Sequence, residues 1–138
     1  MKDHKGRVTR DGIRIYEQAD FAGMHAAGQV TAQILDEVAE HVFPGQTTGA
    51  IDAFIEKRVV EMGTTSATIG YRGYKHASCI SVNHVVCHGI PGDKKLKDGD
   101  ILNIDVTVIK DGWFGDSSRM YVAGKMNRKA ERLVQVTH

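Results

Sequence analysis

Apolar and polar positions along the chain follow two different periods, and these periods predict an α/β protein. Between residues 19 and 41, apolar side chains recur at steps of three and four, and residues 51–62 repeat this helical pattern. Residues 101–109 instead alternate with a period of two, and residues 113–122 indicate a partner strand. We therefore expect an α+β arrangement in which amphipathic helices cover one face of an antiparallel sheet.

Local signals place the ends of these elements and predict the others. Thr47 or Thr48 can cap the second helix, Gly63 can end it, and Asn127 can cap a last helix with an apolar side formed by Leu133 and Val134. The remaining expected segments are a short edge strand at 13–15, strands at 77–83 and around 85–88, a turn-rich loop at 89–93 and a charged, solvated segment at 94–100.

The Asp111-Gly112 pair predicts a tight hairpin between the strands at 101–109 and 113–122. A two-residue turn would place Asp105 opposite Ser118, with Asp116 a diagonal neighbour on the same face. A register shifted by two residues would pair the two aspartates directly. In both registers the two carboxylates point to one side of the sheet.

Two ionised carboxylates at this separation repel each other, so the arrangement requires either a cation or a shared proton. Carboxylate oxygens suit hard divalent ions. Alternatively, a buried aspartate can be structural, held by an arginine or by backbone N–H groups, but Arg119 alternates onto the other face of its strand. Gly115, directly before Asp116, is expected to let a metal or substrate approach the backbone closely.

Composition narrows the possible functions. The chain has 138 residues, 41% of them hydrophobic and 25% charged, with a net charge of +1, which gives no signal for nucleic acid or an anionic membrane as the main partner. No apolar run approaches the length of a membrane span. Residues 1–12 are basic but are not followed by an apolar segment, so we expect a mobile arm and no secretory signal.

Few other residues are candidates for a catalytic or binding role. Cys79 and Cys87 are expected to be buried, reduced thiols of a cytoplasmic protein. His88 differs from the other histidines because the sequence His-Gly-Ile-Pro holds it at the end of an expected strand, whereas His4, His25, His41 and His76 are expected to be solvated. The motifs of serine hydrolases, P-loop nucleotide enzymes, dinucleotide-binding proteins and HExxH metalloproteases do not occur.

Several segments together resemble the bacterial type I methionine aminopeptidases. They are Gly70-Tyr71-Arg72-Gly73-Tyr74, Cys79-Ile80-Ser81-Val82-Asn83, Cys87-His88-Gly89-Ile90-Pro91, Asn103-Ile104-Asp105-Val106-Thr107 and Gly115-Asp116-Ser117-Ser118-Arg119-Met120. The resemblance runs from about Ile13 to His138 but covers only the first half of the family's domain. It implies the pita-bread fold, and residues 13–138 are therefore expected to be the N-terminal half of that catalytic domain, ending within a helix.

The resemblance also implies roles for individual residues. Asp105 would chelate one metal ion and Asp116 would bridge two ions of the Co, Mn, Fe, Zn or Ni class. His88 would contact the substrate and help with proton handling, and Tyr71, Tyr74 and Cys79 would line the pocket for the methionine side chain. A metal-bridged water would remove the initiator methionine from nascent polypeptide N-termini, in the cytoplasm and near the ribosome.

The sequence departs from the family's pattern at two positions, and two alternative functions remain open. Arg72 stands where many members of the family have a histidine, and Thr68 where some have a cysteine. The family's other ligands, one histidine and two glutamates, would follow His138, so we expect this chain alone to be inactive and prone to self-association, and the full enzyme to be a monomer. The alternatives are a non-catalytic pita-bread interaction module and a prolidase-like peptidase that acts before proline.

Overall fold

The computed structural model describes residues 6–138, and its centre is a four-stranded antiparallel sheet. The strands are β3 (Thr65–Ser66), β4 (Ser78–Val82), β5 (Ile101–Lys110) and β6 (Trp113–Val122). β5 pairs along its whole length with β6, while β4 and then β3 share its other edge. Because each of the other three strands pairs with β5, the position of β5 sets the register of the entire sheet.

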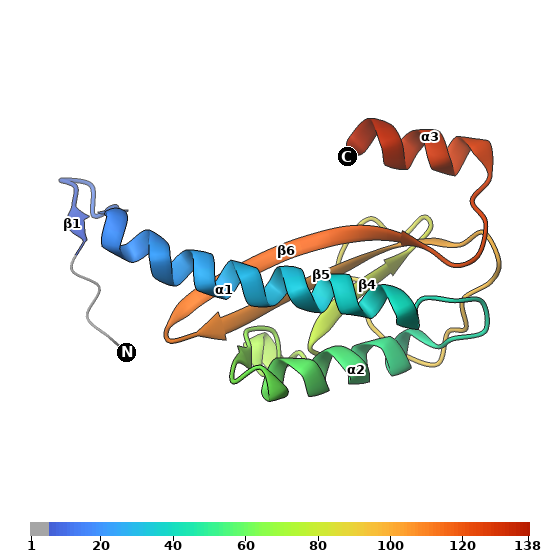
Figure 1. Ribbon diagram of the computed structural model, residues 1–138, viewed down its shortest axis with the longest axis horizontal. Coiled ribbons are helices and arrows are strands. Elements are labelled where there is room, and N and C mark those ends of the chain that lie inside the picture. Colours follow the sequence, from blue (N-terminus) through green and yellow to red (C-terminus); the bar gives the residue numbers. More distant parts are fainter. Residues whose placement is uncertain (1–5) are drawn as a thin grey trace.

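Helices cover one face of this sheet, as the apolar periodicity predicts. α1 (Gln18–Glu37) packs mainly on β6 and β5, and α2 (Thr48–Glu61) packs on β4 and β3 (Figure 1). A short 3-10 helix, η1 (Val38–His41), continues α1. Buried apolar side chains from α1, α2 and the covered face of the sheet form the core: Ile34, Leu35, Ile51, Ile55, Val59, Leu102, Ile104, Val106 and Val108.

Of the two registers that the sequence left open, the hairpin between β5 and β6 adopts that of the two-residue turn. Asp105 pairs with Ser118 and Thr107 pairs with Asp116, so the two aspartates are diagonal neighbours. The two turn residues both have positive φ, 51° for Asp111 and 85° for Gly112, as a type I′ turn requires. The two-residue turn thus sets the alignment on which the aspartate pair depends.

The predicted caps are present in the structure. The Thr47 side chain accepts a hydrogen bond from Ala50 N at 3.2 Å, and the Asn127 side chain accepts one from Ala130 N at 2.9 Å. Gly63 follows α2 with a φ of 69°, the left-handed conformation expected of a helix stop. Each cap satisfies an N–H or carbonyl group that the end of a helix leaves unpaired.

The expected role of Gly115 is wrong, because this residue faces α1 and not the aspartates. A Cβ atom at this position would lie 2.3 Å from the carbonyl oxygen of Ala27. The carbonyl oxygen of Gly115 in turn accepts a hydrogen bond from the buried Thr31 hydroxyl at 2.7 Å. Gly115 therefore allows α1 to pack closely on β6, and side-chain alternation explains why Asp116 points the other way.

Two further local predictions are wrong. Residues 85–88 form a loop and not a strand, and this loop attaches to β4 through a hydrogen bond from Ile80 N to Gly89 O at 2.8 Å. Within the charged segment 94–100, Leu96 is buried in the core, at 2% exposure. In both segments a contact with another part of the chain decides the outcome, and local composition does not reveal that contact.

The two ends of the described chain add little to the core. β1 (Arg7–Val8) and β2 (Arg14–Ile15) form a small exposed hairpin, so part of the expected arm at 1–12 has structure, and residues 1–5 lie outside the described residues. α3 (Arg128–Thr137) has the predicted amphipathic pattern, but none of its residues is buried. It borders a groove of about 510 Å³ that it shares with Asn103, Ser118 and Met120 of the sheet.

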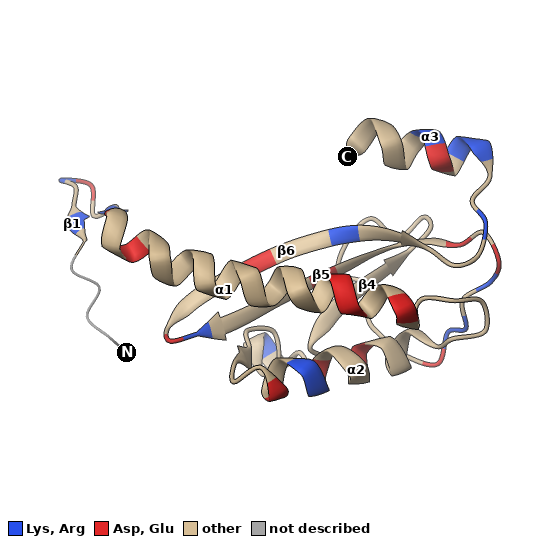
Figure 2. Ribbon diagram, in the orientation of Figure 1, with Lys and Arg blue, Asp and Glu red and all other residues tan. Residues whose placement is uncertain are grey.

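Charge is mixed along the molecule. α2 and α3 each carry both acidic and basic residues, whereas α1 carries only the acidic residues Asp20, Asp36 and Glu37 (Figure 2). Among residues 6–138, no helix is long and apolar enough to cross a membrane.

Candidate functional site

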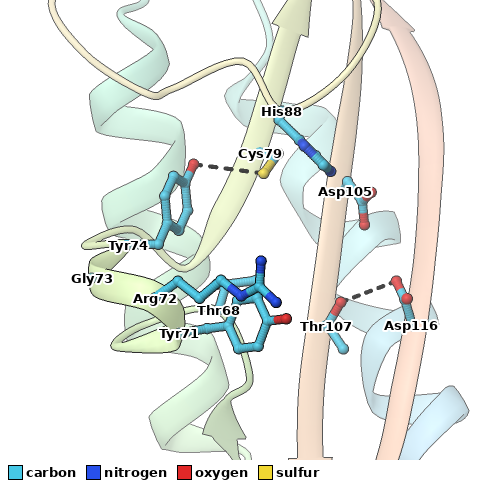
Figure 3. Close-up of a pocket in the computed structure, with 10 residues that line it drawn as sticks. All are labelled: Thr68, Tyr71, Arg72, Gly73, Tyr74, Cys79, His88, Asp105, Thr107 and Asp116. Carbon is cyan, nitrogen blue, oxygen red and sulfur yellow. Dashed lines mark hydrogen bonds between the residues drawn. The ribbon is translucent and has the colours of Figure 1, made fainter.

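A hollow of about 550 Å³ opens on the face of the sheet opposite α1 and α2 (Figure 3). Its walls come from the loop after β3, from β4, from the loop before β5, and from the β5–β6 hairpin. The lining residues are Thr68, Tyr71, Arg72, Gly73, Tyr74, Cys79, His88, Asp105, Thr107 and Asp116. All six site residues predicted from the sequence are in this set, so the fold brings them together.

The hairpin supplies the acidic side of the hollow. Asp105 is half-buried on β5, Asp116 is exposed on β6, and both face the hollow. The Thr107 hydroxyl donates a hydrogen bond to Asp116 Oδ1 at 3.0 Å, which fixes the orientation of that carboxylate. Arg119 lies on the other face and pairs with Asp36 of α1 at 2.5 Å, as the alternation predicts. Arg119 is therefore not the partner of either aspartate.

Burial raises the pKa of Asp105 above its ordinary value, and the nearby Asp116 carboxylate raises it further, whereas the His88 imidazole acts in the opposite direction. The two aspartates are diagonal neighbours in the hairpin, so their carboxylates repel each other when both are ionised. A cation between them would remove that repulsion.

The donor chemistry fits a hard or borderline divalent cation, because both facing side chains are carboxylates. Across residues 6–138, however, no three His, Cys, Asp or Glu side chains gather into a group that could enclose a metal ion. Asp105 and Asp116 are thus suitable but incomplete ligands. The predicted roles of chelating and bridging carboxylate remain predictions.

His88 is held at the rim of the hollow by the backbone of its loop. It adopts a left-handed conformation with a φ of 56°. The next residue, Gly89, lies against β4, where a Cβ atom would be only 2.1 Å from the carbonyl oxygen of Ile80. Gly89 N also donates a hydrogen bond to Ser81 Oγ at 3.1 Å. This attachment directs the imidazole of His88 toward Asp105 (Figure 3).

Tyr74 and Cys79 form the inner wall of the hollow. The Tyr74 hydroxyl donates a hydrogen bond to the carbonyl oxygen of Ser78 at 2.8 Å, and the Cys79 thiol donates to the Tyr74 hydroxyl at 3.6 Å. Burial raises the pKa of both Tyr74 and Cys79. Both groups therefore stay neutral near pH 7, which suits the binding of an uncharged side chain.

Tyr71 and Arg72 form the outer wall. The guanidinium carbon of Arg72 lies 5.4 Å from the centre of the Tyr71 ring, a cation–π contact. Arg72 has a φ of 49°, a left-handed conformation that is costly for a residue with a long side chain. The Arg72 side chain extends over the Tyr71 ring toward Thr107 (Figure 3).

The sequence did not assign a role to Thr107, although its place on the polar face of β5 was a usable signal. It also gave no sign of a hydrogen-bonded cluster behind β4, which joins Asp52, His76 and Ser78. His76 was expected to be solvated and Cys87 to be buried, and both expectations are wrong, because His76 contacts Asp52 and Cys87 is exposed. His76 lies 24 positions after Asp52 and Ser78 lies 26 positions after it, so no short sequence motif connects the three residues.

Comparison with known proteins agrees with this geometry. Residues 22–138 match metallopeptidase family M24. The chain is 48% identical over 126 residues to the methionine aminopeptidase of Rickettsia prowazekii, a match that covers 91% of this chain and 49% of that protein. It is 48% identical over 127 residues to the methionine aminopeptidase of Escherichia coli, covering 91% and 48%. The chain thus spans about half the length of the curated relatives that it matches.

Solved structures give the same result for the fold. The crystal structure of methionine aminopeptidase from Rickettsia prowazekii superposes with a TM-score of 0.89 at 48% identity, covering 91% of this chain and 50% of that one. These matches confirm the predicted resemblance and the predicted first half of a pita-bread fold. The chain belongs to metallopeptidase family M24.

Proposed function

We propose that this chain supplies the N-terminal half of the active site of a metal-dependent methionine aminopeptidase. The observation that carries the proposal is the convergence of six residues from separate segments on one hollow: Tyr71, Tyr74, Cys79, His88, Asp105 and Asp116. Relatives with this name are 48% identical over 91% of the chain, which supports the same activity in the protein to which the chain contributes.

Asp105 and Asp116 would hold two divalent cations of the Co, Mn, Fe, Zn or Ni class. When bound, such cations supply Lewis acidity toward a peptide carbonyl and lower the pKa of a water molecule. The carboxylates neutralise the charge of the cations, and Thr107 keeps Asp116 oriented toward the hollow by donating to Oδ1. The half-buried position of Asp105 strengthens its attraction for a cation, because little water competes for it.

The other lining residues would bind and orient the substrate. Tyr71, Tyr74 and Cys79 offer an aromatic, uncharged wall with a soft sulfur, which suits the thioether of methionine. His88 lies at the rim and points toward Asp105, so it can donate a proton to, or accept one from, the peptide bond that is cleaved (Figure 3).

The substrate would be the N-terminal methionine of a newly made polypeptide, and the setting would be the cytoplasm close to the ribosome, with the full enzyme a monomer. Residues 13–138 would form the N-terminal half of the catalytic domain. A non-catalytic binding module is the second candidate, and retention of both carboxylates in one hollow argues against it. The prolidase of Pyrococcus horikoshii superposes with a TM-score of 0.72 but at 17% identity, so it supports the fold alone.

The experiment joins this chain to the part of the Rickettsia prowazekii methionine aminopeptidase that lies beyond the matched region. With Co²⁺ or Mn²⁺ present, release of methionine from Met-Ala-Ser is measured for the parent and for Asp116→Ala. We expect Asp116→Ala to lose at least about a thousandfold in kcat/KM, because an electrostatic contact to the reacting centre is removed. Asp93→Ala, a change at an exposed aspartate, should keep the parent's activity.

Two outcomes would count against the proposal. One is a folded hybrid that binds Mn²⁺ but does not release methionine, which would favour the binding module. The other is Asp116→Ala activity within about tenfold of the parent, equivalent to a barrier change of only about 1.4 kcal/mol. The 138-residue chain alone should release little or no methionine, since its described residues bring only two carboxylates to the site.

A further inference from the structure

A buried carboxylate lies on the helix side of β4, directly behind the inner wall of the hollow. Asp52 of α2 is 4% exposed. Its Oδ1 accepts a hydrogen bond from Ser78 Oγ at 2.6 Å, and its Oδ2 lies 3.1 Å from His76 Nδ1. Asp52 belongs to neither the acidic pair nor the set of lining residues, so the proposed reaction leaves it without a role.

The energetics of this cluster make it a strong local constraint. Burying a carboxylate is costly unless hydrogen bonds replace its hydration, and bonds to an ionised oxygen are shorter and stronger than neutral ones. Ser78 is fully buried and the His76 side chain is 33% exposed, so Asp52 draws both residues toward α2. The backbone from residue 76 to residue 78 is therefore tied to the helix.

The same short segment carries the inner wall of the hollow on its other side. The carbonyl group of Ser78 lies on the free edge of β4, where it accepts the hydrogen bond from the Tyr74 hydroxyl at 2.8 Å. The Tyr74 ring packs edge-on against the His76 ring, with centroids 5.5 Å apart. Cys79 is the next residue after Ser78 and donates to the same Tyr74 hydroxyl. A displacement of residues 76–78 must therefore move both Tyr74 and Cys79.

We infer that Asp52 is a positioning residue for the pocket, which sets the places of Tyr74 and Cys79 by holding Ser78 and His76 from the helix side of β4. The assignment of that pocket to a methionine side chain rests on the proposed function. The positioning itself rests only on the hydrogen bonds described above.

A second ion pair on α2 provides a matched control. Arg58 binds Glu37 of α1 with Nε to Oε2 at 2.6 Å and Nη2 to Oε1 at 3.0 Å. This pair also joins α2 to a neighbouring element, but neither residue lines the hollow. Glu37→Ala therefore breaks a contact between α1 and α2 but leaves every residue that lines the hollow unchanged.

The test uses the 138-residue chain with Cys87→Ser, so that Cys79 is the only thiol. The rate of Cys79 alkylation by iodoacetamide is measured at one pH, together with urea unfolding. We expect Asp52→Ala to raise this rate about tenfold, because the contacts of Asp52 with Ser78 and His76 are lost. Asp52→Asn can still accept from Ser78 and should stay within about twofold of the parent, as should Glu37→Ala.

The outcomes separate positioning from general stability. An Asp52→Ala rate within about twofold of the parent, in a chain that unfolds cooperatively, overturns the inference. Equal acceleration by Glu37→Ala also overturns it, because the effect would then be one of helix packing. If Asp52→Ala fails to fold, His76→Ala and Ser78→Ala each remove one bond and carry the same test, with acceleration expected for both and no acceleration overturning the inference.

A kinetic measurement on the joined protein then distinguishes the inference from the proposed function. Asp52→Ala should raise KM for Met-Ala-Ser about tenfold and leave kcat within about threefold, since the acidic pair and His88 are untouched. Faster alkylation without a change in KM would keep the positioning role and reject the methionine pocket. An unchanged alkylation rate rejects the positioning role, whatever the peptidase assay gives.

Discussion

The β5–β6 hairpin and the loops that wall the hollow differ in how they are held. The hairpin is set by a two-residue turn and by alternation along ten-residue strands. The walls at residues 68–76 and 84–91 lie outside the sheet. Residues 68–76 include a short 3-10 helix, η2 (Tyr71–Gly73), with turn hydrogen bonds of its own, and both walls attach to the free edge of β4, through Tyr74 to Ser78 and through Gly89 to Ile80. The two aspartates thus lie on a regular hairpin, whereas the residues of the two wall segments depend on attachment to a neighbouring strand.

This difference predicts how substitutions in each part of the site should affect the stability of the protein. Changes in the hairpin should act on global stability, because its covered face forms the core. Changes in the walls should act locally, because loops with few buried contacts open without unfolding the domain. Four predictions test the comparison.

The largest effect is expected within β5, where the two faces of one strand can be compared. Ile104 is fully buried, and Ile104→Ala should cost about 2–5 kcal/mol of unfolding free energy because it leaves a cavity. Its neighbour Asn103 lies on the polar face, and Asn103→Ala should cost less than about 1 kcal/mol. Urea unfolding followed by circular dichroism measures both, and equal losses would contradict the two-faced strand.

Gly115→Ala should come next, with a loss of about 1–3 kcal/mol, because the added methyl group would press on the Ala27 carbonyl of α1. The control is Gly28→Ala, in the same helix, where a Cβ atom meets nothing within 4 Å. That change should be neutral or stabilising by up to about 1 kcal/mol, since alanine favours helix over glycine. A Gly115→Ala chain as stable as the parent would contradict close packing at this point.

Gly89→Ala should act on the loop and leave the domain folded. The added Cβ would clash with the Ile80 carbonyl at 2.1 Å, so the loop should detach from β4 and release Ile80 N–H. Amide exchange at Ile80 should become about tenfold faster, with the unfolding midpoint little changed. Gly92→Ala, in the same loop with open space around it, should leave this exchange rate as it is. If Gly89→Ala instead lowered the stability of the whole domain, the loop would behave like the hairpin, and the comparison would be wrong.

The smallest effect concerns the pH dependence of stability. Burial and the Asp116 charge raise the pKa of Asp105 in the folded chain, so the folded state holds its proton more tightly than the unfolded state. Stability should therefore fall as pH rises from the ordinary value of an aspartate through the raised pKa. Asp116→Asn should lower the Asp105 pKa and flatten this fall. Urea midpoints measured between pH 3 and pH 7 give the comparison, and a steeper fall in the variant would contradict the repulsion.

Much of the fold could be predicted because its signals are local. The Asp111-Gly112 turn, the apolar period of α1 and the cap residues Thr47 and Asn127 each act within a few positions of the element they define. The loop at 85–88 could not be predicted, because its apolar residues resemble a strand. In the structure Asn83 and His88, on either side of these residues, have φ values of 53° and 56°, which an extended strand does not allow.

The candidate site could likewise be predicted where its signals are local, and could not be predicted where it depends on contacts between distant segments. Asp105 and Asp116 were expected on one face because strand alternation and the turn are properties of the sequence alone. The pocket residues were expected only through resemblance to a family, since Tyr71, Cys79 and His88 come from segments with no shared period. The anchor formed by Asp52 behind β4 was not expected, because it requires α2 and β4 to be packed together.

The sequence by itself therefore determined the main helices, the hairpin and the shared face of the two aspartates, because turn chemistry and side-chain alternation operate over short distances along the chain. The tertiary structure decided that Gly115 serves the packing of α1, that the loops attach to the free edge of β4, and that Asp52 lies behind the pocket wall. These outcomes depend on contacts between segments far apart in the chain, which no local pattern encodes.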